Sequence, residues 1–253
     1  MPLTPSHAVV ALAFRRTSLP ASAVAIGAMT PDLPLFVSFA PAYEHTHSLM
    51  WLPLTIALAA LLWGLWRVAI APAARDLSPA FLAERYPGPG VRVVSRPVGA
   101  SGRGRAILVT TAALVLGVLT HIVWDGFTHR SGWAVEAFPA LQQSVGGTPL
   151  YSLLQDGSSV LGLIIIAIWF AGLPAVELDE TARLRTRWLR LTTVIAVVAA
   201  TVVCGIRAFQ VGPAPWHMLF EFVTSWGLVV GIAVLVAGIA WRVLDVREPA
   251  PVV

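Results

Sequence analysis

Five long apolar segments limit what this chain can fold into more than any other feature. They cover residues 48–71, 106–124, 158–173, 191–206 and 218–241. An α-helix needs about 20 predominantly apolar residues to cross the hydrocarbon core of a bilayer. The first, second and fifth segments meet that length, and the third and fourth reach it with flanking residues. We therefore predict an all-α fold: a polytopic transmembrane helical bundle with five full spans, forming a single integral membrane domain over residues 1–253.

The composition supports a membrane protein. The chain is 57% hydrophobic and only 12% charged, about half the charged fraction of a soluble domain. These values argue against an ordinary cytosolic enzyme, and they exclude intrinsic disorder because disordered chains are poor in apolar residues. The one cysteine, Cys204, lies inside an apolar segment, which excludes an internal disulfide and a cysteine-based metal cluster. Any metal ion must then be bound by His and carboxylate groups.

The positions of the arginines predict the orientation of the chain. All 17 basic residues are Arg, and thirteen of them lie in residues 72–105 and 174–190, at Arg67, or at the end of the last span and beyond it. The connections 125–157 and 207–217 hold only Arg130 and Arg207. Arginine-rich loops stay in the cytoplasm, so we expect segment 72–105 to be an irregular cytoplasmic loop rich in Arg, Pro and Gly. The basic charge then indicates topology and a lipid bilayer as partner, not nucleic acid.

A sixth apolar region, residues 8–29, is interrupted by Arg15, Arg16 and Pro20. Burying two arginines and a proline in a full crossing is costly. We predict an interfacial or re-entrant region of two short helices at the outer face, the first ending near Arg16 and the second covering residues 21–29. The alternative, a full crossing, would separate His7 from Asp32 by about 30 Å. Thr4 and the proline after it predict a helix start with Thr4 as N-cap.

Paired metal-ligand residues occur at the outward ends of the predicted spans. His121 and Asp125 are four residues apart, as are His217 and Glu221, and residues at this spacing project from the same helix face. His47 precedes the first strong span. Asp32 lies in a turn between Pro31 and Pro34, where the prolines restrict the backbone.

Two further histidines are candidate ligands. His7 falls in the first turn of the predicted first helix, where the helix dipole favours the neutral, metal-binding ring. His129 would lie about 12 Å from His121 on an unbroken helix, too far to share one ion. Gly126 would let the chain fold back and bring them together. Otherwise His129 serves a second ion or none.

Structural explanations compete with metal binding at these positions. Asp32 is a possible turn former, one of His45 and His47 a possible interfacial residue, and Ser158 or Ser159 a helix cap. Asp125 and Glu221 could simply form ion pairs with Arg130 and Arg207. An ionisable group at the bilayer centre costs about 2.5–3.5 kcal/mol, and less near the edge, so a clustering of such groups in a chain poor in charge indicates a use.

We therefore predict a site for a divalent metal, zinc by ligand type, on the outward face. The first choices of ligand are Asp32, His47, His121 and Asp125, and the second choices are His7, His129, His217 and Glu221. The carboxylates Asp32, Asp125 and Glu221 are the catalytic candidates, one of them as general base.

Several motifs carry a family resemblance. Thr4-Pro5-Ser6-His7, Pro31-Asp32, His45-Thr46-His47-Ser48, His121-x-x-Trp124-Asp125-x-x-Thr128-His129 and Leu154-Gln155-x-Gly157-Ser158-Ser159 together resemble the bacterial domain-of-unknown-function 4184 family. More distantly, they are similar to inner-membrane proteins known as membrane-bound metal-dependent hydrolases. The order of His7, Asp32, His47, His121 with Asp125, His129, and His217 with Glu221 is similar to the zinc sites of phospholipase C and P1-type nucleases.

These resemblances imply zinc-dependent hydrolysis of a phosphoester. At lipid depth the expected substrate is a lipid or lipid-linked phosphoester. The rival hypothesis is a non-catalytic membrane protein, either a metal-binding or transport module or a scaffold. Transport predicts ionisable groups spread through the membrane thickness, whereas these groups collect at one face.

Overall fold

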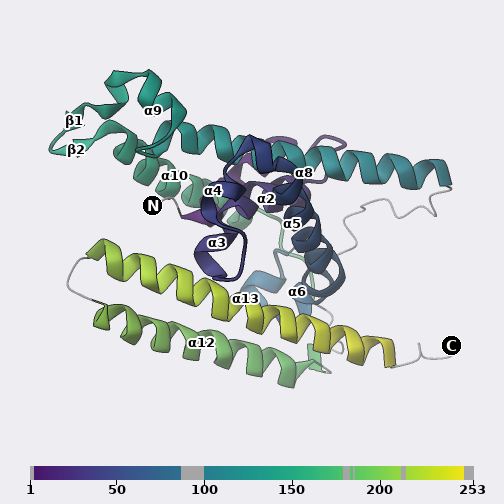
Figure 1. Ribbon diagram of the computed structural model, residues 1–253. Helices are drawn as coiled ribbons and strands as arrows, with labels where there is room; N and C mark the ends of the chain where they lie inside the picture. The colour runs from purple at the N-terminus through teal and green to yellow at the C-terminus, as the bar shows by residue number, and fades with distance from the viewer. Residues whose placement is uncertain (1–2, 87–99, 179–182, 185, 212–214, 248–253) are drawn as a thin grey trace. The chain divides into compact units, whose positions relative to one another are not determined.

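The computed structural model describes residues 3–86, 100–178, 183–184, 186–211 and 215–247. Nearly all of the secondary structure in these residues is helical, with one short two-stranded hairpin (Figure 1). The chain divides into two compact units. The first comprises Met1–Trp63 and Arg96–Ala171, and the second comprises Gly64–Ser95 and Gly172–Val253.

The first unit contains the amino-terminal helices and two long helices. In chain order its elements are η1 (Thr4–Val10), α1 (Ala11–Phe14), α2 (Ala21–Met29), η2 (Thr30–Asp32), α3 (Leu33–Phe36), α4 (Tyr43–Thr46), η3 (Leu49–Trp51), α5 (Leu52–Leu65), α8 (Ala100–Thr128), α9 (Trp133–Ala137), η5 (Pro139–Gln142), β1 (Ser144–Val145), β2 (Thr148–Pro149) and α10 (Leu150–Ala171). The last two residues of α5 belong to the second unit. Gly146 and Gly147 have φ values of +61° and +85°, which suit the tight turn between β1 and β2.

The second unit consists of helices. Its elements are η4 (Trp66–Ile70), α6 (Ala71–Leu77), α7 (Ala80–Ala83), α12 (Arg187–Gln210) and α13 (Pro215–Arg247). The helices α12 and α13 lie side by side (Figure 1). Gly238 lets α13 approach η4 closely, because a Cβ there would fall 2.5 Å from the carbonyl oxygen of Ala69. The Trp241 indole donates a hydrogen bond of 2.9 Å to Asp76.

Five helical stretches are long and apolar enough to cross a membrane. They are Leu49–Leu77, Gly102–Ala137, Leu150–Ala171, Arg187–Gln210 and His217–Leu244. Each contains most of one predicted span. The predicted segment 158–173 is extended at its start, and the predicted segment 191–206 is extended at both ends. The all-α prediction with five spans is confirmed, and the chain is a multi-pass membrane protein by the length and composition of its helices.

The first long span continues past its predicted end. Proline inside a helix lacks an N–H group and collides with the carbonyl four residues earlier. Here the wider π-helical turn η4 ends at Ile70, two residues before Pro72, and the chain remains helical through α6. The prediction of an irregular loop over 72–105 is therefore wrong at both ends, since α6 and α7 are helical and α8 begins at Ala100. Residues 87–99 of that predicted loop lie outside the described residues.

The amino-terminal region forms two short helical arms that return to one place. The apolar arms Thr4–Phe14 and Ala21–Phe36 are separated at Arg15–Pro20 as predicted. The Thr4 hydroxyl donates a hydrogen bond of 2.7 Å to Asp32 Oδ2, so the start of the first arm meets the second arm. A full crossing by residues 8–29 could not make this contact. The N-cap prediction for Thr4 is wrong, because Leu3 occupies that position and makes no side-chain cap.

Small residues allow α2 to pack directly on α8. A Cβ at Gly27 would fall 2.4 Å from the Leu114 carbonyl oxygen, and a Cβ at Gly117 would fall 2.2 Å from the Val24 carbonyl oxygen. No larger side chain fits at these two positions without moving a backbone. The surrounding core consists of Ala11, Ala23, Val24, Ala59, Ala113, Leu114 and Val118. This close contact places the last turn of α2 beside His121.

Candidate metal centre

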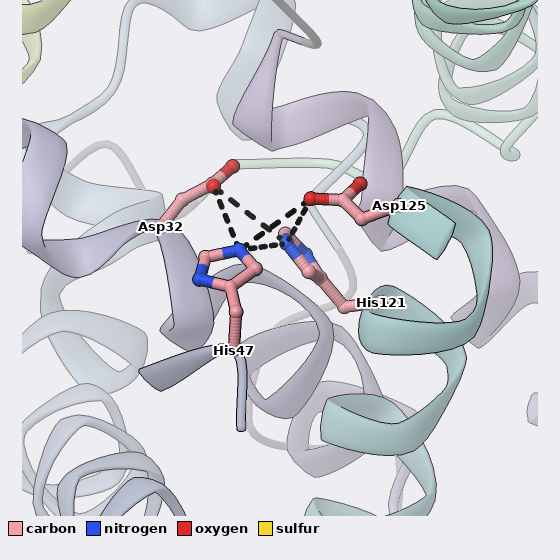
Figure 2. A group of neighbouring side chains, drawn as sticks. All are labelled: Asp32, His47, His121 and Asp125. Atoms are coloured by element: carbon pink, nitrogen blue, oxygen red, sulfur yellow. Dashed lines mark hydrogen bonds and ion pairs between the residues drawn. The ribbon is translucent and has the colours of Figure 1, made fainter. Parts of the chain in front are cut away.

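Four side chains that are typical metal ligands converge in the first unit (Figure 2). Asp32 ends η2, His47 follows α4, and His121 and Asp125 project from one face of α8. Each residue offers one nitrogen or oxygen atom, and the four atoms lie within 4.8 Å of one another. Asp32 and His121 are fully buried, and Asp125 is 5% exposed. The four first-choice ligands predicted from the sequence therefore form one compact group.

The separations within this group match a tetrahedral metal site. The Nε2 atoms of His47 and His121 are 3.1 Å apart. Asp125 Oδ2 lies 3.2 Å from His121 Nε2 and 3.4 Å from His47 Nε2. Asp32 Oδ1 lies 3.6 Å and 3.7 Å from the same two nitrogens. Zinc bonds to nitrogen and oxygen of about 2.0–2.2 Å with tetrahedral angles place ligand atoms roughly 3.3–3.6 Å apart.

Backbone carbonyls fix which nitrogen of each ring faces the group. The Nδ1 atom of His121 donates to the Ala28 carbonyl at 2.6 Å, and that of His47 donates to the Tyr43 carbonyl at 3.0 Å. A carbonyl oxygen can only accept, so each Nδ1 carries the hydrogen. In the neutral rings the Nε2 lone pairs then point into the group, which is the orientation that metal-binding histidines have.

Three of the four carboxylate oxygens of Asp32 and Asp125 lack a hydrogen-bond donor among the described residues. Among the described residues, Asp32 Oδ1 and both carboxylate oxygens of Asp125 are buried without a hydrogen-bond partner. Two carboxylates and two acceptor nitrogens thus face one another with no donor between them, which is unfavourable in a buried place. A divalent cation balances the two negative charges and accepts all four lone pairs. The residues therefore fit a metal ion.

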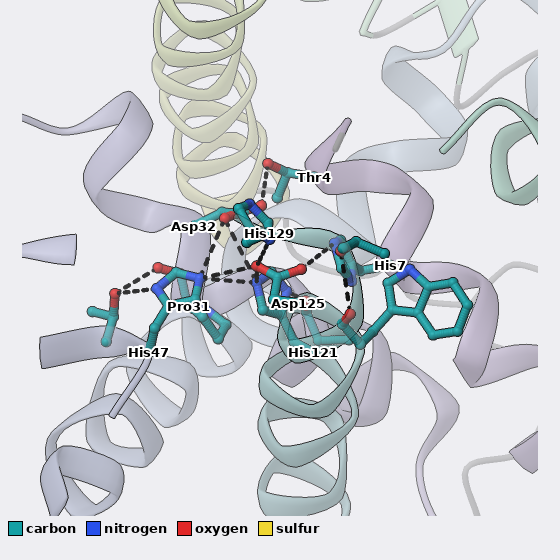
Figure 3. Close-up of polar contacts among 12 residues, drawn as sticks. Thr4, His7, Pro31, Asp32, His47, His121, Asp125 and His129 are labelled. Atoms are coloured by element: carbon teal, nitrogen blue, oxygen red, sulfur yellow. Dashed lines mark hydrogen bonds and ion pairs between the residues drawn. The ribbon is translucent and has the colours of Figure 1, made fainter. Parts of the chain in front are cut away.

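Asp125 also connects the group to His7 and His129 (Figure 3). Asp125 Oδ1 lies 3.7 Å from His7 Nε2, and Asp125 Oδ2 lies 3.4 Å from His129 Nδ1. The His7 ring stacks on the His121 ring at 4.0 Å. Burial, and after it the neighbouring His121, lowers the pKa of His7 to about 3. His7 is therefore neutral at physiological pH, as predicted, although burial is the main cause.

The acidity of Asp32 reflects competing surroundings. Burial raises the pKa of its carboxyl group, while His121 and the hydrogen bond from Thr4 act in the opposite direction. Because Thr4 occupies Oδ2, only Oδ1 is left for the metal group.

His129 reaches the group by a route that the sequence did not suggest. The helix α8 runs unbroken through Gly126 to Thr128, and the His129 amide continues it by donating to the Asp125 carbonyl at 3.0 Å. Of the two alternatives considered for His129, the fold-back at Gly126 therefore does not occur. Instead, Gly126 makes room for Trp133, whose indole nitrogen would lie 2.2 Å from a Cβ there. His129 contacts Asp125, one turn away, and not His121.

Tyr43 and Gln155 belong to the surroundings of the group but were not among the predicted site residues. The Tyr43 ring stacks on the His47 ring at 3.7 Å, and burial raises the pKa of its phenol. The buried Gln155 amide nitrogen lies 3.0 Å from His129 Nε2. Gln155 is part of the motif Leu154-Gln155-x-Gly157-Ser158-Ser159, and that motif was the one signal that could have found it. Nothing in the spacing marked Tyr43.

The two serines of that motif are not helix caps. Both lie inside α10. Ser159 Oγ accepts a hydrogen bond of 3.2 Å from the Leu3 amide, and Ser158 Oγ accepts one of 3.2 Å from the Trp124 indole. These serines attach the amino terminus and α8 to α10.

The structure does not place the remaining predicted residues in the four-residue group. His217 is exposed on α13 in the second unit. Glu221, on the same helix, accepts a hydrogen bond of 2.9 Å from Arg207 Nε, the ion pair considered as its alternative role. Metal binding by His217 and catalysis by Glu221 stay predictions. His45 is half-buried and packs near Trp51, so His47 is the member of the His45–His47 pair that lies in the group.

A polar pocket of about 270 Å³ opens beside the metal group. It is lined by Tyr43, His47, Ile122, Asp125, Gly126, His129, Ser131, Gly132 and Trp133. Two of the four metal-ligand candidates, His47 and Asp125, thus line a space that a small polar molecule can enter.

The comparisons with known proteins identify the family. The family described as Domain of unknown function (DUF4184) matches residues 1–244. The chain belongs to the DUF4184 family. No curated protein and no solved structure matches this DUF4184 protein. Its function must therefore be argued from the chemistry of its residues.

Proposed function

We propose that this DUF4184 protein is a membrane-bound metal-dependent hydrolase. The observation that carries the proposal is the buried meeting of four acceptor atoms, two imidazole nitrogens and two carboxylate oxygens, beside a polar pocket. Zinc is the expected metal because histidine and carboxylate ligands in a four-coordinate arrangement are typical of zinc sites. Such an ion supplies Lewis-acid chemistry, lowering the pKa of water and polarising a substrate oxygen.

The residues around the metal group have distinct roles in this proposal. Asp32, His47, His121 and Asp125 would hold the ion. Asp125 Oδ1 is left without a hydrogen-bond donor among the described residues, so it can accept the proton of an attacking water as general base. His129, which lines the pocket, holds its Nδ1 atom 3.4 Å from Asp125. Tyr43 keeps the His47 ring in position by stacking and through its carbonyl.

The proposed substrate is a phosphoester in a lipid or lipid-linked molecule. Three of the four ligands lie on or directly before the apolar spans Leu49–Leu77 and Gly102–Ala137, so a substrate held in the bilayer can reach them. The phosphoester follows from the similar order of ligands in zinc-dependent phospholipase C and P1-type nucleases. The arginine distribution supports a site on the outward face of the membrane, and the resemblance to a bacterial family supports the bacterial cytoplasmic membrane as its location.

Metal analysis of detergent-purified protein tests the binding part of the proposal. We expect zinc or a similar ion to copurify and the metal content to fall by about tenfold or more in His47→Ala and His121→Ala, since each removes one ligand. His45→Ala is the matched control, because His45 lies two residues from His47 and outside the group. Equal metal content in all four proteins would refute the site.

Measuring turnover distinguishes a hydrolase from a non-catalytic membrane protein. We expect the purified protein to release phosphate or alcohol from a phospholipid or alkyl phosphate, to lose this activity with a chelator and to regain it with zinc. Asp125→Asn should lose turnover more than it loses metal, because one oxygen remains as a ligand. Metal binding without turnover of any phosphoester would favour a non-catalytic metal-binding protein.

A further inference from the structure

A second pocket adjoins the metal group and takes no part in the proposed chemistry. It has a volume of about 360 Å³ and lies in the first unit between η1, α8 and α10. Its lining consists of Ser6, His7, Val9, Val10, Thr120, Trp124, Ser158, Ser159, Leu161, Gly162 and Ile165. This volume falls within the range of about 300–1,000 Å³ that is usual for ligand sites. We call it the apolar groove.

We propose that the apolar groove binds a hydrocarbon chain of the substrate. The substrate class is then an amphipathic phosphoester with its anionic head group at the metal and an alkyl, acyl or prenyl chain in the groove. This inference rests on the proposed function and adds to it a binding site for the apolar part of the molecule.

The direction of the groove follows from two contacts between η1 and α10. The Leu3 amide donates to Ser159 Oγ, and a Cβ at Gly162 would lie 3.0 Å from the Ser6 carbonyl oxygen. The step from Leu3, the N-cap of η1, to Ser6 within it thus matches the step from Ser159 to Gly162 along α10, so the two elements run in the same direction. On both, the polar lining residues come first and the apolar ones follow. The groove is therefore polar at one end and apolar at the other.

The polar end of the groove meets the metal group through His7. His7 lines the groove, its ring stacks on His121, and its Nε2 atom lies 3.7 Å from Asp125 Oδ1. His7 Nε2 is also buried without a hydrogen-bond partner among the described residues. The His7 side chain thus lies between the groove and a head group at the metal centre.

The apolar end of the groove is open towards the side of the helices. Leu161 and Ile165 are 57% and 40% exposed, and both belong to the candidate span Leu150–Ala171. Exposed apolar residues of a spanning helix face lipid. Apart from His7, no ionisable side chain lines this groove in the described part of the chain. A hydrocarbon chain entering from the bilayer is therefore its favoured occupant, whereas an ionic ligand would lack partners along most of its length.

Photo-crosslinking with a chain-labelled alkyl phosphate tests the groove directly. The probe is hexadecyl phosphate with a diazirine near the end of its chain, added to detergent-purified, metal-loaded protein. We expect crosslinked peptides from η1 and α10, and we expect unlabelled hexadecyl phosphate to compete while inorganic phosphate does not. Crosslinks confined to helices other than η1, α8 and α10, or competition by inorganic phosphate alone, would overturn the proposal.

Two neighbouring substitutions give a matched control. Ile165 lines the groove, whereas Ile164 is 48% exposed and does not. Ile165→Trp should fill the groove and reduce crosslinking by about tenfold, while Ile164→Trp adds the same ring on another side of α10 and should leave the yield unchanged. Equal yields from both variants would refute a chain in this groove.

Parallel measurement of phosphate release distinguishes the groove from the proposed hydrolysis. Crosslinking in the groove without phosphate release supports chain binding and counts against the hydrolase. If hydrolysis occurs, Ile165→Trp should raise KM for hexadecyl phosphate and leave turnover of butyl phosphate unchanged. An equal loss of activity towards hexadecyl phosphate and butyl phosphate would show that the substitution acts on the metal site. This result would overturn the proposal that the groove binds a hydrocarbon chain.

Discussion

At the scale of single residues, Asp125 contacts more histidines of the site than any other described residue does. Its Oδ2 atom lies within 3.4 Å of nitrogens from His47, His121 and His129, and its Oδ1 atom faces His7. One carboxylate thus serves four imidazole rings that come from three separate parts of the chain. The effects of substitutions at these positions are therefore coupled and should not add.

Thr4 supports the metal group from outside it. Thr4→Val removes the hydrogen bond to Asp32 Oδ2 and leaves this buried oxygen without a donor. We expect metal affinity to fall by about 10–100-fold, the usual effect of losing a partner of a ligand. Titration of the metal-free protein with zinc measures this. Thr17→Val is the control, since Thr17 is exposed and bonds only within its own turn; an equal loss in both variants would contradict the role of Thr4.

Because His7 is buried and neutral, we predict that the free energy of unfolding depends on pH. Its pKa is about 3 in the folded protein and near 6.5 in an unfolded chain. As pH falls from 6.5 towards 3, the unfolded state takes up a proton that folded His7 does not, so stability falls. One proton changes the free energy of unfolding by at most about 1.4 kcal/mol per pH unit.

His7→Gln should therefore flatten this dependence. Unfolding of metal-free wild type and variant in detergent, compared between pH 6 and pH 4, measures the difference in slope. Carboxyl groups such as Asp32 titrate in both proteins, so they largely cancel in the comparison. Identical slopes would show that His7 is not buried as a neutral ring.

The sequence predicted which four residues come together in the metal group but not the residues that orient them. The pair His121 and Asp125 was visible because helix geometry fixes how residues four apart project. The prolines around Asp32 likewise indicated a rigid turn. The hydrogen bonds from His121 to the Ala28 carbonyl and from Thr4 to Asp32 join residues 93 and 28 positions apart. Such contacts depend on how helices pack, and local spacing carries no information about them.

At the scale of the elements, the packing of α2 on α8 determines whether the site can form. Gly27→Ala would place a methyl group against the Leu114 backbone and push the helices apart, moving Ala28 away from His121. We expect a loss of about 1–3 kcal/mol in stability from this overpacking, together with weaker metal binding. Unfolding by SDS and zinc titration measure the two effects.

The control for Gly27 is another helical glycine. A Cβ at Gly64 would meet nothing within 4 Å, so Gly64→Ala should keep full metal binding and equal or higher stability because alanine favours a helix. If Gly27→Ala binds zinc as tightly as Gly64→Ala does, the close contact of α2 and α8 is not needed for the site.

Helices were easier to predict than their ends. Long apolar segments indicated the five spans because hydropathy reports burial in lipid. From local preferences alone, Gly126 was considered as a helix end, and the segment that begins at Pro72 was predicted to be an irregular loop. In the structure, packing against Trp133 explains Gly126, and a π-helical turn accommodates Pro72. Tertiary contacts and local adjustments of the backbone override such preferences.

At the scale of the whole molecule, the arginine distribution predicts topology. Reporter fusions after Arg96 and Arg187 should be cytoplasmic, and a fusion near Gln143 should be external. Because Leu3 contacts Ser159 and His7 contacts Asp125, the amino terminus must lie on the same side as the Gln143 connection. Cysteine at the exposed Pro5, in a Cys204→Ser background, should react with an impermeant thiol reagent in intact cells. Reaction only after lysis would place the site on the cytoplasmic face.

The two short amino-terminal arms have a consequence for biosynthesis. They leave the ribosome before α8, yet neither is long enough to cross the bilayer. Asp32 at the end of η2 meets His121 only when α8 has been made. The order of synthesis is thus opposite to the order of assembly: α8 must be inserted before the first thirty residues can fold against it. Until then, residues that are buried in the folded protein lack their partners in the nascent chain. Chaperones and membrane proteases recognise such incompletely folded chains.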